Sequence, residues 1–161
     1  RIDYDAVLEL RKSEVKGGGK PVSGDINYMP PNEQFYKNVS KRSDIDPDGF
    51  IDIIAHGNKN KIQMFVNGQV MDVDHRTASR IISNAPGYSG QNIRLLSCNT
   101  GGIDNGFAQN LANKLNVTVS APNNYLWAYP DGSMVVAGKL PKGLPDLNNI
   151  GRFINFVPGI G

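Results

Sequence analysis

Two residues that together could carry out nucleophilic catalysis each follow an apolar run in this sequence. His56, one of two histidines, comes directly after residues 50–55 (FIDIIA), and Cys98, the only cysteine, comes directly after residues 92–97 (NIRLLS). A cysteine attacks as its thiolate, and a neighbouring imidazole can take the proton. If the two runs form neighbouring parallel strands, both side chains emerge at the same edge of the sheet, where open α/β sheets bind ligands. The spacing therefore predicts a Cys-His dyad.

The neighbours of the dyad suit this chemistry. Gly57 has no Cβ, so its backbone N–H can approach a substrate carbonyl and form an oxyanion hole together with the N–H of Cys98. Taken alone, a cysteine after a buried strand is most often a small core residue, and a histidine there is usually an ordinary loop residue. The matched positions after two similar runs favour the catalytic interpretation. No second His/Cys cluster at ligand spacing accompanies them, so we expect no metal site.

The elements that must position the dyad have the pattern of an α/β fold. Both apolar runs have the composition of strands buried on two faces. Between them, the sequence predicts a hairpin with its turn at Asn67-Gly68 and a helix capped by Asp74, and we expect His75 at the surface. That length is sufficient for a right-handed crossover between parallel strands.

Further elements are expected on both sides of this unit. Residues 32–41 predict a helix, and residues 104–115 predict a second helix, with Asp104 as its cap. A strand at 117–121, a hairpin at 125–138 and a closing strand within 151–159 follow. The order of elements predicts an α/β sandwich with a mostly parallel central sheet, flanking helices and a C-terminal β-flap.

Composition limits the class of protein. A length of 161 residues fits one domain, which we expect to cover residues 1–161, with residues 1–19 as a flexible N-terminal arm that ends in three glycines. The absence of an initial methionine suggests a piece excised from a larger protein. A net charge of +2 is too small to indicate a nucleic-acid partner, and no apolar run is long enough to span a membrane. One cysteine excludes an internal disulfide.

The two strand-end motifs resemble those of caspase-like (clan CD) cysteine peptidases. FIDIIAHGNKN and NIRLLSCNTGG are similar to the histidine and cysteine strands of the autoprocessing cysteine protease domains of large clostridial glucosylating toxins and multifunctional autoprocessing repeats-in-toxin proteins. Gly-Cys is more usual there than Ser97-Cys98. The likeness extends from about Lys20 to the end of the chain. PVSGDINY resembles the family's Gly-Asp motif, which implies that Asp25 orients His56, with Asp52 or a backbone carbonyl as alternatives.

The resemblance implies a cysteine endopeptidase domain of a bacterial toxin or secreted effector, which acts in the target-cell cytosol. Its substrate would be a polypeptide, either the parent chain in an autocatalytic cleavage or a host protein. In this family the loop and flap after the cysteine strand shape the substrate pocket, which implies a wall formed by Asn123, Asn124, Tyr125 and Trp127.

Inositol hexakisphosphate activates the toxin domains from a basic pocket under the flap. In this sequence the flap and tail offer only Lys139, Lys142 and Arg152, where so highly charged a ligand needs a dense cluster of cations. We therefore expect no required cofactor and treat inositol hexakisphosphate as an optional allosteric activator.

Two alternatives remain open. The chain could be a catalytically inactive caspase-like binding module, or the same dyad could perform another thiol reaction such as acyl transfer or deamidation, because a fold alone does not select the acceptor. The presence of both His56 and Cys98 favours an enzyme.

Overall fold

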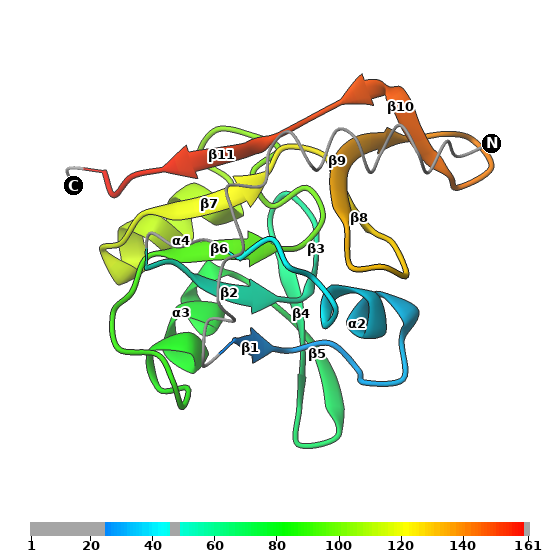
Figure 1. Cartoon of the computed structure of the whole chain (residues 1–161). Coiled ribbons are helices and arrows are strands. Elements are labelled where there is room, and N and C mark those ends of the chain that lie inside the picture. The colour runs from blue at the N-terminus through cyan, green and yellow to red at the C-terminus, as the bar shows by residue number, and fades with distance from the viewer. Residues whose placement is uncertain (1–24, 46–48, 160–161) are drawn as a thin grey trace.

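Four parallel strands form the centre of the molecule (Figure 1). They are β1 (Ile26–Asn27), β2 (Ile51–Ile54), β6 (Ile93–Leu96) and β7 (Val119–Pro122), which lie side by side in that order. The strand β11 (Phe153–Phe156) is antiparallel to β7 and completes the sheet. This structure is a computed structural model, and it describes residues 25–45 and 49–159. The prediction of an α/β fold is confirmed, whereas the predicted arm and the first residues of the Gly-Asp segment lie outside the described residues.

The central strands are apolar because both of their faces are covered. All four residues of β2 and all four of β6 are buried. On one face, Ile53 and Leu95 join a core with the helices α3 (His75–Ser83) and α4 (Phe107–Leu115). On the other face, Ile54 and Leu96 join a second core. It contains residues of the helix α2 (Gln34–Val39) and of the strands β8 (Tyr125–Ala128) and β9 (Met134–Lys139). The sheet therefore separates two cores.

Three helices flank this sheet in the described part of the chain. The helix α3 (His75–Ser83) begins after Asp74, whose carboxylate accepts hydrogen bonds from two backbone N–H groups of the first turn, so the predicted cap is confirmed. The helix α4 (Phe107–Leu115) begins after Gly106 with no side-chain cap, so the prediction of Asp104 as its cap is wrong. The helix α2 (Gln34–Val39) is shorter than predicted. None of these helices is long and apolar enough to cross a membrane.

Two small antiparallel sheets extend from the central one. The strands β3 (His56–Gly57), β4 (Ile62–Val66) and β5 (Gln69–Val73) form the first, and its β4–β5 turn has positive φ angles at Asn67 and Gly68, as the predicted hairpin requires.

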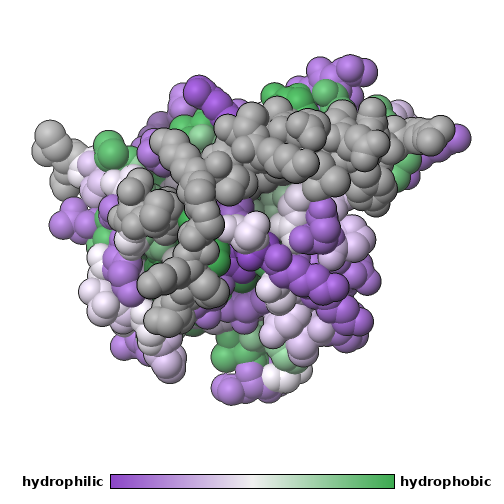
Figure 2. Space-filling view, viewed as in Figure 1, coloured by the Kyte–Doolittle hydropathy of each residue, from purple (hydrophilic) through white to green (hydrophobic). Residues whose placement is uncertain are grey.

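The second small sheet is the flap that follows β7. It contains β8 (Tyr125–Ala128), β9 (Met134–Lys139) and β10 (Pro145–Ile150) in the order β10-β9-β8. No strand is predicted from the sequence at the position of β10. The register between β9 and β10 shifts after Asp146, and this irregular pairing explains why no alternating pattern marks the strand. Figure 2 shows that hydrophilic residues cover much of the visible described surface, with hydrophobic residues in separate patches.

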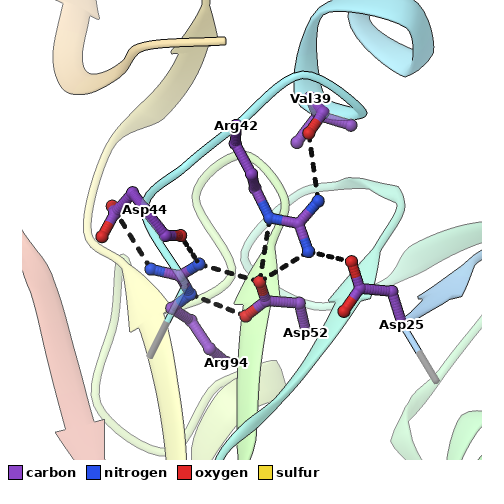
Figure 3. Close-up of polar contacts among 6 residues, drawn as sticks. All are labelled: Asp25, Val39, Arg42, Asp44, Asp52 and Arg94. Atoms are coloured by element: carbon purple, nitrogen blue, oxygen red, sulfur yellow. Dashed lines mark hydrogen bonds and ion pairs between the residues drawn. The ribbon is translucent and has the colours of Figure 1, made fainter. Parts of the chain in front are cut away.

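A buried charge network joins the central strands (Figure 3). The side chain of Asp52, only 1% exposed, receives Arg94 Nε at 2.7 Å on one carboxylate oxygen and Arg94 Nη2 at 2.8 Å on the other. Arg42, from the segment after α2, donates its Nε to Asp52 at 3.0 Å and also contacts the carboxylate of Asp25. Arg94 further donates to the backbone carbonyl of Asp44 at 2.6 Å. One carboxylate therefore links β2, β6 and the segment after α2.

We predict that Asp52→Asn strongly destabilises the fold. The substitution leaves two buried guanidinium groups without their shared counter-charge, and breaking a buried pair in this way costs about 3–5 kcal/mol. Urea unfolding followed by circular dichroism measures the decrease in the free energy of unfolding. The matched control is Asp25→Asn, which removes a carboxylate that is 29% exposed and should cost about 1 kcal/mol or less. An equal decrease in the free energy of unfolding in the two variants would contradict a central role for Asp52.

Candidate active site

The two predicted catalytic residues lie at the carboxyl ends of neighbouring parallel strands. Ile54 of β2 is the register partner of Leu96 of β6, and the N–H of Ala55 donates to the carbonyl of Leu96 at 3.2 Å. His56 lies two residues after Ile54, and Cys98 lies two residues after Leu96, so both follow the same level of the paired strands. Cys98 packs against the core that contains residues of α2 and the flap, and His56 contacts Glu33, the residue before α2, so both lie on that side of the sheet. The structure thus brings the pair to one edge.

Cys98 is half-buried and held by the flap. The N–H of Leu126 donates to the sulfur Sγ at 3.4 Å, and the thiol donates to the carbonyl of the same residue at 3.7 Å. Burial raises the pKa of the Cys98 thiol, while the N–H of Leu126 and the charge of Lys139 oppose that shift. In this state the thiol is neutral, so attack requires a base to remove its proton.

The turn after the thiol has a constrained backbone. Asn99 adopts a φ of +60°, in the left-handed region that few residues other than glycine occupy at low cost. Its N–H donates to the carbonyl of Asn124 at 2.9 Å, and the N–H of Gly101 donates to that of Pro122 at 2.8 Å. The loop before the flap therefore holds the chain in the sharp turn that follows Cys98.

The imidazole of His56 contacts a carboxylate that the sequence analysis missed. Its Nε2 makes a short contact with Oε2 of Glu33, the residue that precedes α2. Both side chains are partly exposed, at 45% and 36%. The available signal was the position of Glu33 in the first turn of the helix predicted at 32–41, but nothing local indicates that this helix start faces His56.

Asp25, the predicted orienting residue, lies elsewhere. The pairing of Ile26 with Ile53 sets Asp25 level with Asp52, four residues before His56. At about 3.3 Å per residue this is a separation of roughly 13 Å along the strand. The carboxylate of Asp25 pairs instead with Arg42. The structure thus places Glu33, and not Asp25, beside the imidazole.

Gly57 lies where the histidine and cysteine segments approach each other. A Cβ at this position would lie 2.7 Å from Cγ2 of Thr100 and 3.1 Å from the carbonyl oxygen of Cys98, so only glycine allows this approach. The N–H of Asn58 donates to the carbonyl of Lys61, so these two residues form a hydrogen-bonded pair. Because such pairs alternate with non-hydrogen-bonded pairs along an antiparallel ladder, the neighbouring pair of Gly57 and Ile62 is a non-hydrogen-bonded one. The N–H of Gly57 is therefore not used by the β3–β4 ladder.

A groove of about 820 Å³ adjoins this edge of the sheet. It is lined by residues 58–61 of the β3–β4 turn together with Asp72, Asn99 and Tyr125. Asn99 directly follows Cys98, and the turn at 58–61 directly follows Gly57, so the groove opens next to both predicted catalytic strands.

The predicted pocket wall is only partly in this groove. Tyr125 lines it, whereas the side-chain oxygen of Asn123 accepts the N–H of Arg152 at 2.8 Å, and that of Asn124 accepts the N–H of Tyr125 at 2.9 Å. The indole N–H of Trp127 donates to a carbonyl of β9 at 3.0 Å. Three of the four side chains thus make hydrogen bonds that stabilise the flap and its loops.

The predicted anion-binding residues are spread along the flap. The ammonium of Lys139 lies 5.3 Å from the ring centroid of Tyr125 and is close enough to Cys98 to act on its pKa. Lys142 is exposed in the turn between β9 and β10, and Arg152 is exposed between β10 and β11. Of the three, Lys139 is the one with a described link to the candidate site.

We predict slow alkylation of Cys98 in the folded protein at neutral pH. Because its pKa is raised, the thiolate is scarce there, and the labelling rate should still rise above the pH at which an ordinary thiol has ionised. Whole-protein mass spectrometry with iodoacetamide measures the rate, since the chain has one cysteine. The same protein in urea is the control and should react faster. If the labelling rate of the folded protein reaches its plateau at a lower pH than the rate of the unfolded control, the result would contradict a raised pKa of Cys98.

Comparison with known proteins places the chain in a family. No curated protein and no solved structure matches it. A family described as "Domain of unknown function (DUF8616)" matches residues 24–136, a stretch that contains Glu33, His56 and Cys98 and ends within β9. Because this match covers more than half of the chain, the chain belongs to the DUF8616 family.

Proposed function

We propose that this chain is a cysteine peptidase with a caspase-like fold, in which Cys98 is the nucleophile and His56 the general acid and base. The observation that carries the proposal is the parallel pairing of β2 with β6, because His56 and Cys98 each follow the carboxyl end of one of these neighbouring strands by two residues. The motifs around both residues support it, because they resemble the histidine and cysteine strands of clan CD peptidases.

The reaction follows from the groups at this edge. His56 takes the proton of the Cys98 thiol as the sulfur forms a bond to the carbonyl carbon of the scissile peptide. The backbone N–H groups of Gly57 and Cys98 donate to the resulting oxyanion. The C–N bond then breaks as His56 returns the proton to the leaving amine, and water hydrolyses the thioester with the same base.

Glu33 acts in this proposal as a positioning residue. A carboxylate that accepts the proton on Nε2 selects the imidazole tautomer with its lone pair on Nδ1. Nδ1 is then the atom that exchanges a proton with Cys98. This assignment replaces Asp25 in the role that the resemblance implied.

The proposed substrate is a polypeptide, either the longer chain from which this domain derives or a protein of a target cell. The resemblance to toxin domains supports a bacterial effector that acts in the target-cell cytosol. We propose no required cofactor, and inositol hexakisphosphate remains an optional activator to be tested.

One observation favours a second candidate, a binding module without catalysis. The thiol of Cys98 is neutral and bonded to both backbone groups of Leu126, as a structural cysteine would be. A functional test must therefore separate a reactive thiol from a packed one.

We predict that the chain cuts peptides in a Cys98-dependent manner. Mass spectrometry of a proteome-derived peptide library, with and without inositol hexakisphosphate, should show cleavage products for the wild type and none for Cys98→Ala. His56→Ala should reduce the rate by about 10²–10⁴-fold, the usual contribution of a general acid and base. Identical peptide maps for wild type and Cys98→Ala under both conditions would refute the peptidase and favour the binding module.

We predict that Glu33→Ala lowers kcat about tenfold with little change in KM, because an imidazole without its partner spends less time in the productive orientation. Glu33→Gln keeps an oxygen acceptor and should restore part of kcat. Asp25→Asn is the comparison variant and should retain most activity if it folds, as checked by circular dichroism. The reverse order, with Asp25→Asn inactive and Glu33→Ala active, would return the orienting role to Asp25.

A further inference from the structure

The groove beside the dyad carries two lysines and one carboxylate along its lining. We propose that this groove binds an acidic side chain of the peptide substrate, located one to three residues after the scissile bond. The inference rests on the proposed peptidase function and adds a substrate preference to it.

The first link is between the groove and His56. On the small sheet, His56 is the register partner of Gln63, and Lys61 lies two residues before Gln63, just ahead of β4, so the alternation of side chains puts Lys61 on the same face as Gln63. Diagonal neighbours of this kind have Cβ atoms about 7–8 Å apart, within reach of a long side chain. The ammonium of Lys61 therefore belongs to the same exposed face as the imidazole.

The second lysine is held in place by its surroundings. The backbone carbonyl of Lys59 accepts the N–H of Phe107 at 2.8 Å. Its aliphatic stem lies against Gly102, where an added Cβ would be 3.4 Å from both Cγ and Cε of the lysine. The stem of Lys59 thus packs on the loop that follows Cys98, and the residue lines the groove.

The charge of the groove is not cancelled internally. Asp72 is the carboxylate in the described lining, and it stands opposite Gln63 on β5, which makes it a diagonal neighbour of Lys61. No ion pair joins Asp72 to Lys59 or Lys61 among the described residues. Two ammonium groups against one carboxylate leave a net positive groove, which attracts Asp or Glu and disfavours Lys or Arg.

The side of the scissile bond follows from the chemistry. The acyl part of the substrate stays on the sulfur of Cys98, whose other contact is Leu126 of the flap. The leaving amine departs from the side of His56, because the imidazole gives it a proton. The groove shares the exposed face of His56, so it receives the residues that follow the cleaved bond.

The test is cleavage profiling of the wild type and of the double variant Lys59→Glu/Lys61→Glu with the same peptide library. In the wild type, Asp and Glu should be enriched at one of the three positions after the cut, and a matched peptide with Lys there should be cut about 5- to 20-fold more slowly. The double variant should reverse this order. Lys114→Glu, which makes the same charge change at the end of α4, is the control and should keep the wild-type profile.

Each outcome decides a separate question. If peptides are cut with no acidic preference after the bond, or if the preference survives in the double variant, this inference is overturned while the peptidase stands. If no Cys98-dependent cleavage occurs at all, both proposals fail. Lys59→Gln/Lys61→Gln is the fallback if charge reversal prevents folding, and it should abolish the preference without reversing it.

Discussion

The register between β2 and β6 depends on one buried carboxylate. Asp52 is the direct register partner of Arg94, and it binds the guanidinium of that residue through both oxygens. A slip of one residue would separate this pair and would also turn His56 to the opposite face of the sheet. The ion pair near the start of the strands therefore specifies which residues of β2 and β6 stand level. Arg42 adds a second cation and fixes the segment that follows α2 to the same carboxylate.

Local patterns were sufficient to predict the parts of the fold that local interactions determine. The apolar runs before His56 and Cys98, the Asn67-Gly68 turn and the Asp74 cap all depend on neighbours within a few residues, and all occur in the structure. The shared edge was predicted on the condition that the two strands are parallel neighbours, which the length of the crossover permits and the structure shows. These features needed no knowledge of contacts between distant segments.

The features that escaped prediction depend on such contacts. Glu33 reaches His56 across 23 residues, and the chain between them carries no motif that announces the contact. Asp104 has the residue type of a helix cap, but α4 begins two residues later, where the N–H of Phe107 finds the carbonyl of Lys59 instead. Asp25 has the sequence context of a catalytic residue, yet its partner is a buried guanidinium.

The two hydrogen bonds between Cys98 and Leu126 differ in what they require of the sulfur. The bond from the backbone N–H needs only a lone pair on Sγ, whereas the bond to the backbone carbonyl needs the hydrogen of the thiol. Once an acyl group replaces that hydrogen, the carbonyl of Leu126 has no donor there, and β8 keeps one attachment to the cysteine where it had two. In the proposed mechanism, the flap would thus be more weakly tethered while the thioester exists, and hydrolysis, which regenerates the thiol, would restore the second attachment.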